Sequence, residues 1–148
     1  REKYPDAKTV MVSPCVGKRS ESCLYDEVDY VISYEEIEAL FKASNMDLEA
    51  LEPMPLDPNI VGHGRGFAMI SGVTESVKLT APDPNVIKEV VIDGLNKQVI
   101  RQLKQYAKAG QCPGNFIEVM SCPGGCVNGC DTINNPKTAA RQILPTTK

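Results

Sequence analysis

The run from Met120 to Cys130 constrains this chain more than any other segment. It reads Met-Ser-Cys-Pro-Gly-Gly-Cys-Val-Asn-Gly-Cys and directly follows the apolar segment Phe116–Val119. Thiolates select soft metals such as iron–sulfur clusters, zinc and cuprous ions. Glycines let the backbone come close to a bulky inorganic ligand, where a side chain would collide. The run therefore predicts a loop, at the end of a strand, that holds a metal or a metal cluster.

Composition limits the kinds of partner that the chain can have. Its 148 residues carry a net charge of −3, and no basic stripe runs along them, so nucleic acid is not an expected partner. No apolar stretch approaches the ~20 residues that a membrane-spanning helix needs, and no signal peptide is visible. We therefore expect a cytoplasmic protein without a membrane span. Because the first residue is Arg1 rather than Met, we expect a piece of a longer protein.

The six cysteines are clustered rather than scattered. Disulfide frameworks are typical of secreted domains much smaller than this one. The clustering therefore favours a metal or redox site. Cys23 and Cys112 have no motif around them and are interpreted as ordinary thiols.

Apolar runs and turn residues predict an alternation of strands and helices. The expected strands are Lys8–Ser13, Tyr30–Ser33, Glu89–Asp93 and Phe116–Val119. The expected helices are Tyr34–Ala43, Asp47–Leu51, Phe67–Thr80, Leu95–Lys108 and Thr138–Leu144, with a loop over Glu52–Gly64. The alternation is typical of the α/β class, so we expect a single module over residues 1–148 with a mostly parallel sheet flanked by helices.

Two helix ends have recognisable signals. Ser33 and Glu36 have the spacing of a capping box at the start of the helix Tyr34–Ala43. Gly110 is expected to end the helix that precedes it. In that helix Val99, Leu103 and Tyr106 are expected to face inward.

Two cysteine loops are expected, over residues 13–21 and 120–130, and each follows a predicted strand. Parallel α/β sheets place their ligands at the carboxyl ends of the strands. We therefore expect Cys15 and Cys122 at the same edge of the sheet, where one site could use both. Lys18 and Glu21 follow Cys15, and a nearby ammonium favours thiolate over thiol. The alternative for Cys15 is a buried structural cysteine beside a solvated Lys-Arg pair.

These two segments resemble signatures of a known family. Glu118 to Gly129 is similar to the third signature of the iron-only (FeFe) hydrogenase large subunit, approximately E-x-M-x-C-P-G-G-C-x-x-G-G. Pro14 to Glu21 resembles the second signature, P-C-x-x-K-x-x-E. The two occur in the family's order and at about its separation. The resemblance implies one lobe of the large-subunit domain, the C-terminal part of its catalytic region.

The resemblance also implies roles for individual residues. Three cysteines would be ligands of a 4Fe-4S cluster, and the last of them would bridge to a two-iron subsite, which completes the H-cluster: Cys15, Cys122 and Cys126. Lys18 would donate a hydrogen bond to a cyanide of that subsite, Met120 would pack beside it, and Glu21 would orient its surroundings. Gly124 and Gly125 would allow the backbone to approach the cofactor.

The chain departs from the family pattern in three places. The first signature, which supplies the fourth cluster ligand and a proton-relay cysteine, is absent. Ser13 stands where catalytic members usually have Met, and Cys130 stands where they have Gly. These departures indicate a divergent or sensory branch. The expected partners are the N-terminal remainder of the polypeptide, with ferredoxin-like domains, together with dihydrogen and protons.

The sequence leaves three functions open. The first is the iron–sulfur binding part of a protein that oxidises dihydrogen reversibly, with electron transfer, or senses it. The second is a hydrogenase-like iron–sulfur assembly or maturation protein that lacks the two-iron subsite. The third is an α/β module that holds no metal, or zinc on Cys122, Cys126 and Cys130. We expect the isolated chain neither to retain a stable 4Fe-4S cluster nor to catalyse hydrogen chemistry, since it offers only three of the four implied ligands.

Overall fold

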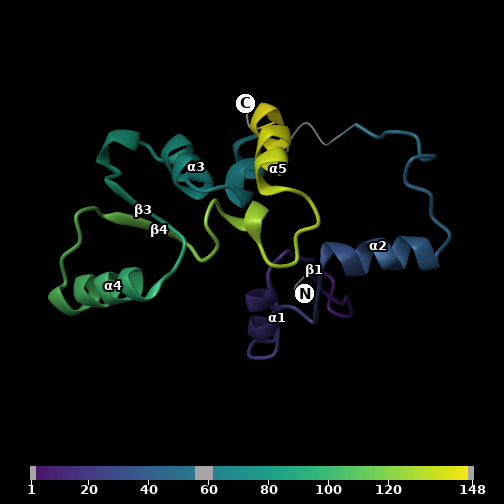
Figure 1. Ribbon diagram of the computed structural model, residues 1–148, viewed down its shortest axis with the longest axis horizontal. Coiled ribbons are helices and arrows are strands. Elements are labelled where there is room, and N and C mark those ends of the chain that lie inside the picture. The colour runs from purple at the N-terminus through teal and green to yellow at the C-terminus, as the bar shows by residue number, and fades with distance from the viewer. Residues whose placement is uncertain (1–2, 56–61, 147–148) are drawn as a thin grey trace. The chain divides into compact units, whose positions relative to one another are not determined.

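The computed structural model describes residues 3–55 and 62–146, and it divides into two units (Figure 1). Unit 1 comprises Arg1–Pro55 together with Gly129–Ile133. Unit 2 comprises Leu56–Asn128 together with Asn134–Lys148. The chain is α/β, with short parallel strand pairs flanked by helices, as the sequence predicts. The single module expected over 1–148 stays a prediction.

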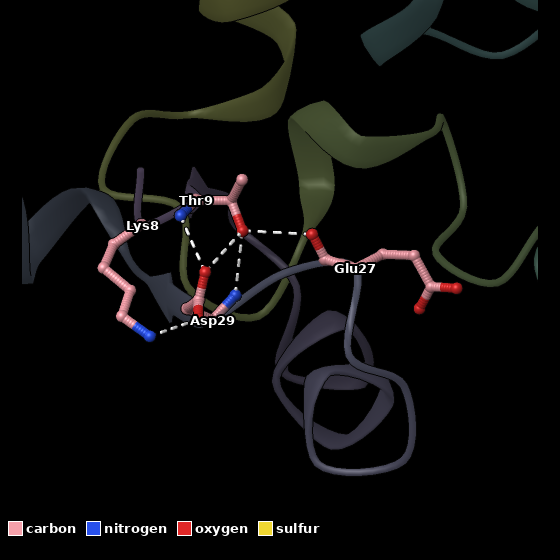
Figure 2. Close-up of polar contacts among 4 residues, drawn as sticks. All are labelled: Lys8, Thr9, Glu27 and Asp29. Atoms are coloured by element: carbon pink, nitrogen blue, oxygen red, sulfur yellow. Dashed lines mark hydrogen bonds and ion pairs between the residues drawn. The ribbon is translucent and has the colours of Figure 1, made fainter. Parts of the chain in front are cut away.

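Unit 1 contains a short parallel pair, β1 (Val10–Val12) and β2 (Tyr30–Ile32), in which Met11 lies opposite Val31. Figure 2 shows the polar contacts that join the starts of these strands. The Thr9 amide donates to Asp29 Oδ2 at 2.8 Å, and Lys8 Nζ lies 3.0 Å from Asp29 Oδ1. Thr9 Oγ1 accepts from the Asp29 amide at 3.0 Å and lies 3.0 Å from the Glu27 carbonyl oxygen. These contacts hold together the two chain segments that lead into β1 and β2.

Two helices follow the strands of unit 1. Helix α1 (Val16–Ser22) follows β1, and helix α2 (Tyr34–Ala43) follows β2. The capping box predicted for α2 is confirmed, because Ser33 Oγ accepts from the Glu36 amide and the Glu36 carboxylate accepts from the Ser33 amide. The segment 13–21, expected to be a loop, is mostly the helix α1. Gly17 in the first turn, and the absence of an apolar stripe and of a side-chain cap, left that helix without a strong sequence signal.

Unit 2 contains the longer parallel pair, β3 (Glu89–Asp93) and β4 (Phe116–Met120), with Val91 opposite Glu118. Helix α4 (Lys97–Ala109) connects them, and its N-cap Asn96 accepts from two amides of the first turn. The helix ends at Gly110, which has a φ of +62°. Val99, Leu103 and Tyr106 are the half-buried residues of an otherwise exposed α4, so the predicted inward face is confirmed.

The helix predicted over Phe67–Thr80 begins five residues later, as α3 (Gly72–Thr80), after the 3-10 helix η1 (Gly62–Ala68). Ser71 adopts a φ of +66°, which breaks the helical path. A Cβ at Gly72 would lie 1.8 Å from the Gly66 carbonyl oxygen, so the backbone doubles back on itself there. Two polar residues, Thr74 and Ser76, are the buried residues of α3.

The remaining elements are short. They are η2 (Pro84–Val86), η3 (Cys126–Asn128), α5 (Pro136–Ile143) and η4 (Leu144–Thr146). The short helix predicted over Asp47–Leu51 is wrong. Asp47 instead closes a turn, in which its Oδ1 accepts from the Glu49 amide at 3.1 Å. Of the loop predicted over Glu52–Gly64, residues 56–61 lie outside the described residues, and Gly62–Gly64 belongs to η1.

The described part of the chain buries little apolar surface. Ile92 and Val127 are the only hydrophobic residues classed as buried within it. Large side chains such as Leu24 and Met54 are 75% and 86% exposed. Over the same residues, every helix is too short or too polar to cross a membrane.

Candidate metal centre

The cysteine loop of unit 2 leaves the carboxyl end of β4. Beside it, the chain leaving β3 continues the pairing, since the Gly94 amide donates to the Met120 carbonyl at 2.9 Å and the Leu95 amide to the Ser121 carbonyl at 3.1 Å. The pairing of the two strands therefore continues up to the start of the cysteine loop. The prediction that Cys122 follows a strand end is confirmed.

The two glycines of the loop have different neighbours. Gly124 has a φ of +83° and Gly125 a φ of +95°, a region that L side chains rarely adopt. A Cβ at Gly125 would lie 2.7 Å from the Ala68 carbonyl oxygen, whereas a Cβ at Gly124 would meet no atom within 4 Å. The Ile70 amide donates to the Gly124 carbonyl at 3.0 Å. The close approach of Gly125 is therefore to the chain's own backbone, and only Gly124 is open on that side.

Local hydrogen bonds hold the loop in shape. The Gly125 amide donates to the Cys122 carbonyl at 3.0 Å, and Asn128 Nδ2 donates to the Pro123 carbonyl at 3.0 Å. The Gly124 amide donates to the Asp93 carboxylate. Within the loop, Val127 is buried, Cys126 is exposed and Cys122 is half-buried. The loop thus presents its thiols on a backbone that is already ordered.

A hollow of about 690 Å³ borders the same loop. Its apolar walls come from the loop, from the segment before α3 and from the C-terminal helices: Met69, Ile70, Pro123, Val127, Pro136, Ala140 and Leu144. The three loop cysteines are not among the described residues that line it. The thiols of the loop therefore do not line this hollow. Met120 ends β4 half-buried, and its implied place beside a two-iron subsite stays a prediction.

In unit 1, Cys15 is the N-cap of α1 and is half-buried. Its carbonyl accepts from the Lys18 amide at 3.1 Å. A Cβ at Gly17 would lie 3.3 Å from Cys15 Sγ, so the thiol lies over the first turn of the helix. Ser13, one of the departures from the family pattern, is buried at the end of β1, where its amide donates to the Ile32 carbonyl at 2.9 Å.

Lys18 and Glu21 form an ion pair on α1. Lys18 Nζ lies 2.6 Å from Glu21 Oε2, and the two side chains are 44% and 55% exposed. Both line a hollow of about 300 Å³ in unit 1 together with Met11, Tyr25 and Val31. The sequence separation of three places the pair on one helix face. Their implied roles at a cofactor stay predictions.

Cys130 belongs to unit 1, although it lies only four residues after Cys126 in unit 2. The Asp131 amide donates to the Pro14 carbonyl at 3.2 Å, and Cys130 Sγ lies 3.9 Å from the same oxygen. Cys15 and Cys130 are thus members of one unit, and Cys122 and Cys126 are members of the other. Within unit 1, the structure brings Cys130 to the backbone beside Cys15.

The donor chemistry suits a soft metal, but neither unit by itself supplies a complete site. Over residues 3–55 and 62–146, no group of three or more His, Cys, Asp or Glu side chains is arranged to hold a metal ion. Thiols on a glycine-rich turn are the ligand type of iron–sulfur clusters. The site that Cys15 would share with Cys122 stays a prediction.

The sequence analysis missed the role of Glu118, the first residue of the third-signature resemblance. Only 4% of Glu118 is exposed. Its carboxylate accepts from the Ser71 and Thr74 amides at 2.8 Å each and from the Thr74 hydroxyl. It thus caps the start of α3, where Ser71 makes no side-chain cap. The sequence signal that could have indicated this role is a charged residue within an otherwise apolar strand.

Comparison with known proteins gives a family and a set of relatives. Residues 1–130 match the family described as "Iron only hydrogenase large subunit, C-terminal domain". "Cytosolic iron-sulfur assembly component 3" of Rattus norvegicus is 27% identical over 91% of this chain and 37% of its own length. A "Probable cytosolic Fe-S cluster assembly factor" of Drosophila virilis is 26% identical over 92% of this chain and 36% of its own length. A shorter match of 45 residues to the Pongo abelii assembly component is 42% identical.

The chain spans a little over a third of the length of these two long matches. The alignment with the rat protein extends over 179 positions, more than the 148 residues of this chain. The rat protein therefore has residues without a counterpart here.

Proposed function

Because this chain belongs to the family of the iron-only hydrogenase large subunit, C-terminal domain, we propose that it is the cluster-binding part of a hydrogenase-like iron–sulfur assembly protein. The observation that carries the proposal is the match of over nine-tenths of the chain to relatives whose names describe cytosolic iron–sulfur assembly. This function is the second of the three that the sequence left open. On the same grounds we place the protein in the cytosol.

Cys15, Cys122 and Cys126 are the proposed cluster ligands. The exposure of Cys126 and the ordered backbone beneath it support this assignment, because a cluster must reach its ligands without unfolding the loop. The bound group would supply an iron–sulfur centre to be held or passed on. The chain's own residues supply thiolates and a glycine-rich turn, with Gly124 open toward the space beside it.

The fourth ligand would come from a part of the family's domain that these 148 residues do not contain. The small number of buried apolar residues supports such a partner, because apolar faces as exposed as Leu24 and Tyr25 favour coverage by more polypeptide. We propose that the N-terminal remainder of the same polypeptide is that partner.

Anaerobic reconstitution with iron and sulfide tests the ligand assignment. A site with three protein thiolates should hold a cluster only while an added monothiol such as glutathione occupies the fourth position. We expect visible iron–sulfur absorption in excess glutathione, and its loss on gel filtration without thiol. The variants Cys15→Ser, Cys122→Ser and Cys126→Ser should each abolish the absorption, because thiolates are the cluster ligands.

Cys112→Ser is the matched control, since Cys112 is a half-buried cysteine of unit 2 outside the loop. This variant should bind the iron–sulfur cluster to the same extent as the unaltered chain. Equal loading of Cys122→Ser and the unaltered chain would contradict the ligand assignment. Stoichiometric zinc in place of iron would favour the third function instead.

Hydrogen oxidation or sensing, in a divergent or sensory branch of the hydrogenases, is the second candidate. The Lys18–Glu21 pair favours it, because both residues match the second signature and lie 2.6 Å apart on one face of α1. Infrared spectroscopy of the protein purified anaerobically from its source separates the two candidates. We expect no bands from metal-bound CO or cyanide, and such bands would establish the H-cluster and overturn the assembly proposal.

A further inference from the structure

Two cysteines that are far apart in the sequence, Cys15 and Cys130, lie near each other in unit 1. The segment Gly129–Ile133 leaves unit 2 and joins unit 1, although the residues on both of its sides belong to unit 2. Its contact there is with the backbone just before Cys15, through the Asp131 amide at 3.2 Å and Cys130 Sγ at 3.9 Å from the Pro14 oxygen. The two thiols are thus attached to backbones that a hydrogen bond joins directly.

These two contacts place the cysteines near each other. The peptide that carries the Pro14 oxygen ends at Cys15, and the peptide that carries the Asp131 amide begins at Cys130. Cys130 Sγ lies 3.9 Å from that same oxygen. Protein disulfides need a Cα separation of about 4.4–6.8 Å, and the shared backbone contact brings the two residues close to that separation.

Both thiols are at least partly accessible to solvent, and the Cys15 side chain has space beside it. Cys130 is exposed and Cys15 is half-buried. Residue 17 has no side chain, and a Cβ there would lie only 3.3 Å from Cys15 Sγ, so glycine leaves the thiol room to rotate. Cys23, the third cysteine of unit 1, is exposed, and its thiol donates to the Arg19 carbonyl of its own helix at 3.4 Å. It offers a matched comparison within the unit.

We propose that Cys15 and Cys130 form a reversible disulfide by exchange with a low-molecular-weight disulfide such as oxidised glutathione. The exposed Cys130, as thiolate, attacks one glutathione sulfur, and the first glutathione leaves as a thiolate that takes up the proton Cys130 released. Cys15, as thiolate, then attacks Cys130 Sγ of the mixed disulfide, and the second glutathione leaves in the same way. Two protein thiols are oxidised to one disulfide, and one glutathione disulfide is reduced to two thiols.

The disulfide has a consequence that rests on the proposed function. A sulfur engaged with Cys130 is no longer a thiolate, so Cys15 would be withdrawn from the cluster ligands. The oxidised chain should then load no cluster until a reductant such as dithiothreitol reopens the bond.

The test uses the metal-free chain, treated with oxidised glutathione in native buffer, quenched with an alkylating reagent and mapped by peptide mass spectrometry. We expect two of the six thiols to become unreactive and a peptide linking Cys15 to Cys130 to be the main product. Cys130→Ser should abolish that peptide, and Cys23→Ser should leave it unchanged. In strong denaturant the product should shift to neighbouring pairs such as Cys122–Cys126, because short loops close at a lower entropic cost.

Three outcomes would overturn the proposal: a native product dominated by Cys126–Cys130 or Cys122–Cys126, glutathione adducts without an internal disulfide, or an equal yield of the linked peptide in native buffer and denaturant. None of these measurements involves iron. A failed disulfide therefore leaves the cluster assignment standing, and failed reconstitution of the reduced chain leaves the disulfide standing.

Discussion

The two strand pairs of this protein are anchored by different kinds of polar contact. The pair β3–β4 in unit 2 has a five-residue ladder, and one of its residues, Glu118 of β4, is a carboxylate that is only 4% exposed. The pair β1–β2 in unit 1 has a three-residue ladder that is joined at its start by Thr9 and Asp29, with Lys8 on the solvent side (Figure 2). Buried charges depend on their partners far more than solvated ones do. Removing the Glu118 carboxylate should therefore lower the free energy of unfolding of unit 2 more than removing the Thr9 hydroxyl lowers that of unit 1.

The largest effect is expected at Glu118. Glu118→Ala removes the acceptor for two amides and a hydroxyl at the start of α3. Hydrogen bonds to a charged group contribute about 1.5–3 kcal/mol each and are not additive, so we expect a loss of about 4 kcal/mol in the free energy of unfolding of unit 2. Hydrogen exchange at the Thr74 amide measures it locally, and unchanged protection there would contradict the anchoring role.

Glu118→Gln and Glu38→Ala are the controls for that comparison. The glutamine keeps one acceptor oxygen and should destabilise less than alanine. Glu38 lies on exposed α2 in an ion pair with Lys42, and its loss should change stability by less than about 0.5 kcal/mol.

The two loop glycines should differ from each other. Gly124→Ala meets no atom within 4 Å and suffers only its positive φ, a cost of about 1–2 kcal/mol. Gly125→Ala suffers the same backbone cost and also collides with the backbone of Ala68 to Ile70, which adds about 1–3 kcal/mol. Chemical denaturation of the two variants measures the difference. Equal stabilities would show that the loop can move away from that backbone.

In unit 1 the matching change is Thr9→Val. Valine has a similar shape but loses the hydroxyl that contacts Asp29 and the Glu27 carbonyl, so we expect a loss of about 1 kcal/mol. Faster hydrogen exchange at the Asp29 and Tyr30 amides would report the weakened start of β1–β2. Thr80→Val, which removes a hydroxyl bonded only to its own helix, should have less effect. If Thr9→Val lowers the free energy of unfolding as much as Glu118→Ala does, the expected difference between the two units is wrong.

The smallest effect is the pH dependence of α2. The Ser33 amide, followed by Arg19, holds the pKa of Glu36 below its ordinary value. A carboxylate with a lowered pKa stabilises the fold above its ordinary pKa, and this contribution is lost as the pH falls through the lowered value. A carbon NMR titration should show the Glu36 carboxyl titrating below the ordinary value for glutamate. Arg19→Gln should bring its midpoint closer to that ordinary value, and a Glu36 midpoint at the ordinary value in the unaltered chain would contradict the capping box as the cause.

Local patterns were sufficient to predict most of the elements. Strand Glu89–Asp93 and helix Tyr34–Ala43 have the predicted bounds, since apolar runs and a capping box act between near neighbours. The helix predicted from Phe67 does not begin there, because Ser71 has a positive φ and the backbone at Gly72 lies against that of Gly66. The helix predicted over Asp47–Leu51 failed because the Asp47 carboxylate accepts from the Glu49 amide and so favours a turn.

What the sequence by itself determined is the chemistry on offer: thiols on a glycine-rich turn after a strand, and a family whose signatures they match. Only the tertiary structure decided the partners of Glu118, the backbone that crosses Gly125, and the placement of Cys130 beside Pro14. These contacts include hydrogen bonds between residues 44, 47 and 116 positions apart. Helix and strand signals act over a few residues, whereas such contacts depend on how the whole chain closes on itself, which no local pattern encodes.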